Sequence, residues 1–158
     1  MATQGNSDLY NMNAGILKKD ACVVLVKTEW NAAIVNELEA GCIAVFKQYG
    51  VKHQTLIVPG AVEITFAIKR CWERNKNSEA PDAFIALGCV IKGDTPHFDY
   101  VCDFVTQGVL QLNLMLPIPT IYGVLTVNTE AQAKERIGGA HGHKGEEAAI
   151  TALKMINS

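Results

Sequence analysis

The chain has 158 residues, 49% of them hydrophobic and 19% charged, which is enough for one domain with a substantial core. Its formal net charge of -2 argues against a nucleic-acid binder, which normally carries a basic face. No run reaches the roughly 18 apolar residues of a membrane span, and residues 1–20 lack the apolar segment of a signal peptide, so we expect a cytoplasmic protein.

The cysteines occur in an odd number and form no C-x-x-C motif. They are Cys22, Cys42, Cys71, Cys89 and Cys102. Because each lies among apolar neighbours, we expect reduced, buried thiols that behave as small hydrophobic side chains. Cysteines and histidines do not cluster at ligand spacing, so no metal site is predicted.

The N-terminal part reads as an arm followed by a first strand and helix. Residues 1–20 are polar and are predicted to form a flexible arm, leaving residues 21–158 as a single domain. The run ACVVLVK (21–27) is typical of a strand covered on both faces. Apolar residues recur at helical spacing over 29–49, and Gly50 marks the helix end.

Two further strand–helix units follow. The segment VKHQTLIV (51–58) predicts a second strand, and residues 61–75 an amphipathic helix. The segment AFIALGCVI (83–91) predicts a third strand. The long apolar segment 97–116 then predicts a largely buried helix.

The C-terminal part begins with a fourth strand in LPIPTIYGVLTV, with its prolines at the strand entrance. Thr129 and Gln132 have capping-box spacing, which predicts a helix through Ile137. The glycine-rich segment GGAHGHKG predicts a turn, and 145–156 the last helix.

Regular alternation of strands and helices predicts a parallel sheet with helices on both faces. We therefore expect a three-layer α/β/α sandwich of the flavodoxin-like kind, with four parallel strands. We also expect the first strand to be an edge that can receive the N-terminal arm of a neighbouring subunit as an added strand. A response-regulator receiver shares these layers, but its acidic residues are replaced here by Lys27-Thr28 and Gly88-Cys89.

Ligands of open α/β sheets bind beyond the carboxyl ends of the strands. Three loops should therefore share one crevice: KTEWN with Trp30 and Asn31, PGAVE with Glu63, and the segment 92–97. Trp30 is either a platform for a planar ligand or a packing residue. The Glu63 carboxylate lies in a first helical turn, where the helix dipole stabilises a negative charge whether or not a ligand is bound.

The segment KGDTPH can form an anion site. Thr95 suits an N-cap and Pro96 the first helical position, so backbone N–H groups and the helix dipole would attract a phosphate. Gly93 permits a phosphate to approach the backbone closely. Asp94 must point away from the phosphate, or it is itself a capping acceptor. The dipole favours a neutral His97 that can accept a proton. The alternatives are an ordinary strand-to-helix turn and a capping or surface histidine.

Several blocks together carry a family resemblance. They are EWNAAIVNELEAG, VPGAVEITFAIKR, DAFIALGCVIKGDTPHFDYV, PIPTIYGVLTVNTEAQAKERIGG and HKGEEAAITALKMI. In this order and at this spacing the chain resembles the lumazine synthase family from about residue 21 to its end. The resemblance implies condensation of 5-amino-6-ribitylamino-pyrimidinedione with 3,4-dihydroxy-2-butanone 4-phosphate, giving 6,7-dimethyl-8-ribityllumazine without metal or cofactor.

The resemblance also implies roles. Trp30 would stack on the pyrimidinedione beside Asn31, and His97 would transfer protons. The other implied substrate contacts are Gly60, Ala61, Val62 and Glu63 for the ribityl chain, Val90, Ile91 and Lys92 for the ring, and Gly93, Asp94, Thr95, Arg136 and Lys144 near the phosphate. Tyr122 falls at an aromatic contributed by an adjacent subunit. His53, His141 and His143 are interpreted as structural, and His143 replaces a common asparagine.

The resemblance further implies a pentamer, or a 60-subunit icosahedral shell of pentamers, with the apolar side of helix 97–116 lining the pentamer core. Riboflavin synthase would be a partner of such a shell. Two alternatives remain open: an archaeal-type riboflavin synthase of the same fold, and an inactive shell protein that binds flavin or lumazine.

Overall fold

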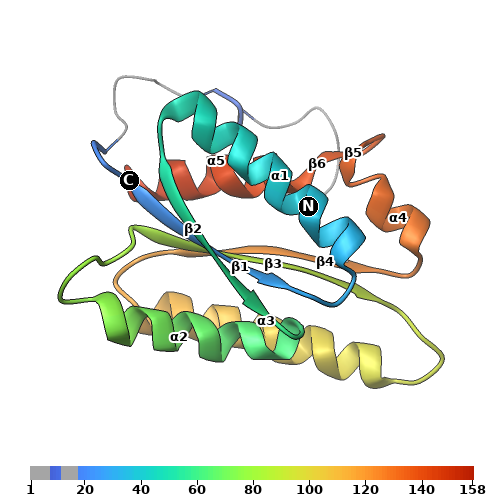
Figure 1. The fold of residues 1–158 in the computed structure, drawn as a ribbon. Helices are drawn as coiled ribbons and strands as arrows, with labels where there is room; N and C mark the ends of the chain where they lie inside the picture. The colour runs from blue at the N-terminus through green and yellow to red at the C-terminus, as the bar shows by residue number, and fades with distance from the viewer. Residues whose placement is uncertain (1–7, 12–17) are drawn as a thin grey trace.

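The computed structural model describes residues 8–11 and 18–158. Its central sheet is parallel and has the strand order β2-β1-β3-β4. These strands are β1 Cys22–Thr28, β2 Lys52–Val58, β3 Ala83–Ile91 and β4 Thr120–Val127. The helices are α1 Ala32–Tyr49, α2 Ile64–Asn75, α3 His97–Met115, α4 Glu130–Lys134 and α5 Lys144–Ile156, with a 3-10 turn, η2 Ala61–Glu63. The three-layer flavodoxin-like prediction is confirmed (Figure 1).

Helices cover both faces of the sheet. Figure 1 shows α1 and α5 on one side and α2 and α3 on the other. Each side has its own apolar cluster, one containing Phe46, Leu38 and Leu153, the other Phe84 and Ile68. β3 is buried along most of its length because it is central and covered twice, which explains its continuous apolar run.

The prediction that β1 is an edge strand is wrong. β1 pairs with β2 on one side and with β3 on the other, so β2 and β4 are the edges. The chain moves outward from β1 to β2 and then crosses back to β3. Alternation along the sequence fixes parallel pairing but not which strand lies inside, so the order could not be read from it.

Two predicted helices differ from the structure. α3 is not largely buried in this chain: Val105, Val109 and Leu112 are buried, whereas Tyr100 and Leu114 expose 74% and 73% of their surface. The helix after Thr129 ends at Lys134 instead of Ile137. A short antiparallel hairpin follows, formed by β5 Ile137–Gly139 and β6 Gly142–His143.

The predicted helix starts and stops agree with the structure in part. Gly50 closes α1 in the left-handed conformation, and Thr129 caps α4 by accepting from the Gln132 amide at 3.2 Å. The prediction for Thr95 is wrong by one residue, because Pro96 occupies the N-cap of α3. The Thr95 hydroxyl instead accepts a long hydrogen bond, 3.4 Å, from the His97 amide.

Most of the predicted N-terminal arm, residues 1–20, lies outside the described residues. The described Asp8 and Lys18 both contact the end of the chain. The Asp8 carbonyl accepts from the Lys154 ammonium at 2.9 Å, and the Lys18 amide donates to Asn157 Oδ1 at 2.7 Å. Among the described residues, none of the helices is long and apolar enough to cross a membrane.

Candidate active site

A cavity of about 390 Å³ lies at the carboxyl ends of the strands. Eleven of the predicted site residues line it: Trp30, Asn31, Gly60, Ala61, Val62, Glu63, Val90, Ile91, Gly93, Thr95 and His97. They come from the loops after β1, β2 and β3 and from the start of α3. The prediction that these loops share one crevice is therefore confirmed.

The loops are tied together by hydrogen bonds. The Trp30 amide donates to the Pro59 carbonyl at 3.1 Å, which joins the ends of β1 and β2. The Asn31 side-chain amide donates to the Cys89 carbonyl at 2.7 Å, which joins the same turn to β3. The cavity rim is thus fixed to the sheet at two points.

Asn31 has a backbone conformation that suits few residues. It lies in the left-handed region with φ 57° and ψ 41°, at the N-cap of α1, and its side chain does not cap the helix. Asparagine tolerates this region better than most residues. The resulting sharp turn leaves the Trp30 indole 74% exposed at the cavity.

The polar groups of the cavity are few. Glu63 and His97 are both exposed at its lining, one at the end of η2 and the other at the first residue of α3. The Glu63 carboxylate folds back toward Gly60, so that Oε2 lies 3.1 Å from where a Cβ at Gly60 would be. A side chain at Gly60 would therefore press on the carboxylate.

The structure adds Thr28, Cys89, Phe98 and Val101 to the cavity lining, and sequence reasoning missed all four. The Thr28 hydroxyl donates to the Trp30 carbonyl at 3.0 Å and stiffens the turn. Burial, helped by Glu130, raises the pKa of the Cys89 thiol to about 11, so Cys89 is not a thiolate nucleophile at neutral pH.

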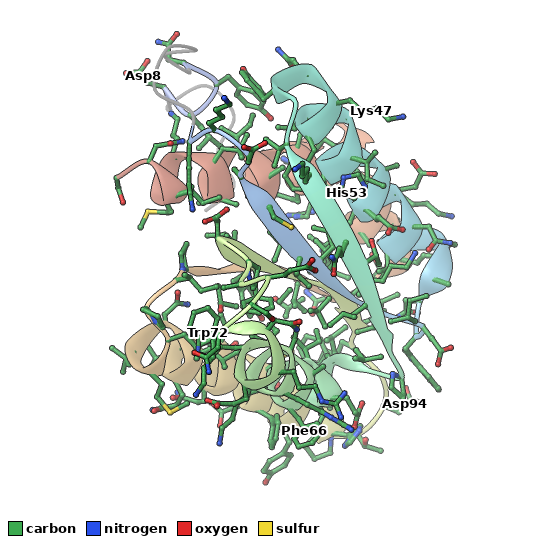
Figure 2. All side chains as sticks on the ribbon, turned by 60° about the vertical axis from the view of Figure 1, so that its left-hand side comes forward. Asp8, Lys47, His53, Phe66, Trp72 and Asp94 are labelled. Carbon is green, nitrogen blue, oxygen red and sulfur yellow. The ribbon has the colours of Figure 1, made fainter. Side chains whose placement is uncertain are left out.

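Five predicted site residues do not line this cavity: Lys92, Asp94, Tyr122, Arg136 and Lys144. Lys92 and Asp94 are exposed on the loop after β3, and Figure 2 shows Asp94 at the rim of the molecule. The Tyr122 hydroxyl shares a 3.3 Å hydrogen bond with Thr106 of α3.

Arg136 and Lys144 lie together at the hairpin. The Lys144 amide donates to the Arg136 carbonyl at 2.8 Å. The Arg136 guanidinium donates to the Gln132 carbonyl at 2.8 Å, and the Lys144 ammonium pairs with Glu147 at 2.7 Å. Both side chains therefore have partners within the chain, and neither lines the cavity.

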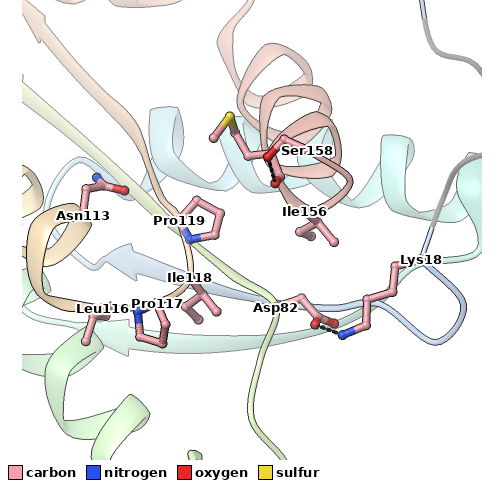
Figure 3. Close-up of a pocket in the computed structure, with 10 residues that line it drawn as sticks. Lys18, Asp82, Asn113, Leu116, Pro117, Ile118, Pro119, Ile156 and Ser158 are labelled. Carbon is pink, nitrogen blue, oxygen red and sulfur yellow. Dashed lines mark hydrogen bonds and ion pairs between the residues drawn. The ribbon is translucent and has the colours of Figure 1, made fainter.

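A second hollow lies at the opposite end of the sheet (Figure 3). Its lining includes Pro117, Pro119 and the Lys18–Asp82 ion pair. The Asp82 carboxylate is already engaged by Lys18 and by the Cys22 amide. This hollow is a gap between strand entrances, and none of the predicted site residues lines it.

The sequence model of the 6,7-dimethyl-8-ribityllumazine synthase family matches residues 20–158. This chain belongs to that family. A protein named 6,7-dimethyl-8-ribityllumazine synthase from Parabacteroides distasonis is 44% identical over 155 residues, covering 96% of this chain and 94% of the relative. The relative of that name from Bacteroides fragilis is 52% identical over 136 residues, covering 84% and 92%.

A third relative, also named 6,7-dimethyl-8-ribityllumazine synthase, comes from Flavobacterium psychrophilum and is 43% identical over 98% of this chain and 82% of its own length. The matches run through every loop of the cavity. Membership of the lumazine synthase family makes the chain an enzyme, a transferase, with small-molecule substrates.

Proposed function

We propose that the chain condenses 5-amino-6-(D-ribitylamino)pyrimidine-2,4-dione with 3,4-dihydroxy-2-butanone 4-phosphate to give 6,7-dimethyl-8-ribityllumazine, phosphate and water. Family membership over residues 20–158 supports the reaction. The main structural support is the cavity at the strand ends, which we propose as the location of the reaction. An exposed indole, a carboxylate and an imidazole line it together.

Each cavity residue has a proposed task. The Trp30 face would stack on the pyrimidinedione, while Glu63 and the backbone of Gly60, Ala61 and Val62 would bind the ribityl hydroxyls. Val90 and Ile91 would pack against the ring edge. Asn31 would hold the Trp30 turn to β3, because its amide already donates to the Cys89 carbonyl.

His97 would be the proton-transfer residue. Forming the imine requires a proton to leave the amine and the carbinolamine to lose water, and the later loss of phosphate removes a proton from carbon. An imidazole at the start of α3 can serve these steps. Orientation of a reactive amine and ketone would supply much of the remaining rate, since effective molarities reach about 10⁵ M.

The phosphate would be held by the loop at Gly93, Asp94 and Thr95, with the Asp94 carboxylate pointing away from it, together with the cations Arg136 and Lys144. Lys92, which follows β3, would lie beside the ring. Gly93 leaves open space, since a Cβ there would meet no atom within 4 Å. Arg136, Lys144 and Tyr122 do not line the cavity of their own chain. A neighbouring subunit would therefore bring them to it.

Assembly into a pentamer, or a 60-subunit shell of pentamers, completes this proposal. Support comes from apolar side chains that the single chain leaves exposed on α3. They are Tyr100, Phe104, Leu110, Leu114 and Met115. An exposed apolar face of this kind usually marks an interface. Residues 1–20 would be an arm on the 21–158 domain, and the assembly would be cytoplasmic, with riboflavin synthase as a candidate partner.

The reaction is tested by mixing both substrates and recording lumazine absorbance. Lumazine must form only when both are present. Incubation with lumazine alone distinguishes the archaeal-type riboflavin synthase, because riboflavin fluorescence would then appear. Binding of lumazine without any turnover would instead indicate an inactive binding protein.

Sharing of the site between subunits is tested by mixing variants. Arg136→Ala should raise the KM of the phosphate-bearing substrate, and His97→Ala should lower kcat. If the two residues come from different subunits, co-assembled variants recover about a quarter of the wild-type sites by random mixing in a ring. Mixed assemblies with no gain over the single variants would contradict a shared site.

A further inference from the structure

His143 occupies the N-cap of α5, where short polar side chains are usual. Its Nδ1 accepts a hydrogen bond from the Glu146 amide at 3.4 Å. An imidazole nitrogen accepts only while it carries no proton. The cap therefore exists in one protonation state of His143 and is lost in the other.

The imidazole fills a narrow space between α1 and α5. A Cβ on Gly41 would lie 2.2 Å from Cε1 of His143 and 2.5 Å from its Nδ1. Next to it, a Cβ on Gly145 would lie 2.0 Å from the Leu38 carbonyl oxygen. The two helices thus approach closely at this point, with the His143 ring against Gly41.

The cap is part of the hairpin that carries the two cations. His143 pairs with Ile137 across β5 and β6, and the next residue, Lys144, donates its amide to the Arg136 carbonyl at 2.8 Å. The residue that caps α5 is therefore joined to both Arg136 and Lys144 through the backbone of the hairpin.

Several charged groups lie around the cap that His143 forms. Glu146 and Glu147 lie in the first turn of α5, and Lys144 is paired with Glu147. On α1, Glu37 is exposed one turn before Gly41. The neighbouring Cys42 thiol donates to the Gly145 carbonyl, and burial raises its pKa to about 12, so it stays neutral.

Two other groups in this region ionise. His141 Nε2 lies 3.5 Å from a carboxylate oxygen of Glu135, so His141 needs its own control. Tyr10 packs near Glu146 and Glu147, and burial raises its pKa further, so it stays protonated below pH 8.

We propose that His143 is a positioning residue whose neutral imidazole caps α5 and holds Arg136 and Lys144 in place for a phosphate, and that its protonation releases them. Anion binding at this hairpin then weakens as the pH falls. The proposal rests on the assignment of Arg136 and Lys144 to phosphate binding.

The kinetic test compares wild type with His143→Asn, which keeps a capping acceptor that does not titrate. Between pH 7.5 and 5.5 the KM of the phosphate-bearing substrate should rise up to about tenfold more in wild type than in His143→Asn, because only the imidazole cap is lost on protonation. The substrate phosphate titrates near pH 6 in both measurements and cancels in the ratio.

Two controls sharpen this test. His143→Ala, which lacks any acceptor, should have a high KM at every pH and a smaller change in kcat. His141→Asn should keep the wild-type pH dependence. Parallel KM profiles for wild type and His143→Asn would overturn the proposal, as would a profile that flattens in His141→Asn.

A second measurement does not need activity. Amide hydrogen exchange over residues 140–150, corrected for the intrinsic pH dependence, should show wild type losing protection at pH 5.5 while His143→Asn keeps it. Equal loss in both would overturn the cap switch. Absence of lumazine formation would instead refute the proposed function while the exchange result still decides the behaviour of the cap.

Discussion

Trp30 exposes 74% of its surface, although an indole normally packs in a core. The hydrogen bonds of its backbone hold it at the cavity rim, so its exposure is a property of the turn. An exposed flat face beside an apolar cavity suits a planar heterocycle.

Trp30→Ala should raise the KM of the pyrimidinedione about fivefold, the effect of losing one aromatic stacking contact. Trp30→Phe should keep most of the affinity. Neither change should lower stability much, because the side chain contributes little to the core. Steady-state kinetics with each substrate varied in turn checks this, and an unchanged pyrimidinedione KM in Trp30→Ala would contradict the stacking role.

His97→Ala should reduce kcat by up to about 10²-fold, the low end of what a general acid–base group contributes. It should not abolish turnover, because orientation of the two substrates remains. His53→Ala is the matched control. His53 lies on β2, its ring centroid is 5.6 Å from that of Phe46, and it does not line the cavity. Equal kcat values for both variants would remove His97 from the mechanism.

At this scale the sequence predicted most of the cavity, since the strand-end rule needs only the positions where apolar runs stop. Val101 was missed although it lies one turn after His97 on the same helix face, a readable signal. Cys89 and Thr28 were missed because they belong to the strands themselves, and only the assembled sheet shows which side chains reach its end.

At the scale of secondary-structure elements, the closest packing joins α1 and α5. The glycines Gly41 and Gly145 allow it, and a Cβ on Gly145 would lie 2.0 Å from the backbone oxygen of Leu38. Because a backbone carbonyl cannot rotate away as a side chain can, α5 would have to move as a unit.

Gly145→Ala should therefore destabilise the fold by about 2 kcal/mol or more, the range of strongly overpacked substitutions. Gly93→Ala is the control, because a Cβ there meets nothing within 4 Å. It should leave the urea midpoint unchanged. A Gly145→Ala variant as stable as Gly93→Ala would show that α1 and α5 are less closely packed than described.

Element boundaries were largely predictable, because β3 and the end of α1 are marked by an apolar run and by Gly50. The hairpin of β5 and β6 was not. It depends on Gly138 and Gly142, with φ of 106° and 76°, and on contacts with α1 and α5. The sequence GGAHGHKG indicates a turn but does not encode those long-range contacts.

At the scale of the whole molecule, buried thiols make the fold sensitive to alkaline pH. Burial raises the pKa of Cys42 to about 12 and that of Cys89 to about 11, from ordinary values near 9. In the unfolded chain both thiols lose their protons at lower pH than in the folded chain. Stability is therefore fully present below about pH 9 and is lost as the pH rises toward 11 and 12.

Replacing Cys42 should flatten this decline. Between pH 9 and 11 the free energy of unfolding of wild type should fall more steeply than that of Cys42→Ala, by up to about 1.4 kcal/mol per pH unit. Denaturant unfolding at several pH values measures both slopes. The cavity left by the substitution lowers stability equally at every pH, so it does not change the slope. Identical slopes would contradict a thiol that stays protonated in the folded chain.

The assembly remains a prediction that single-chain geometry motivates: the cavity holds an aromatic, an acid and an imidazole, while its expected cations lie at the hairpin. Strand order and subunit contacts depend on interactions between distant segments or separate copies, and no local pattern records them. Because a pentamer or a shell of pentamers is proposed, light scattering should give a mass that is a multiple of five chains.

The most direct test is a crystal structure of the assembled protein with 6,7-dimethyl-8-ribityllumazine and inorganic phosphate. We expect the heterocycle on the Trp30 face with His97 near the ring, and phosphate between the Gly93 loop and Arg136 of a neighbouring subunit. Lumazine bound elsewhere, or Arg136 remote from every cavity in the assembly, would contradict this expectation.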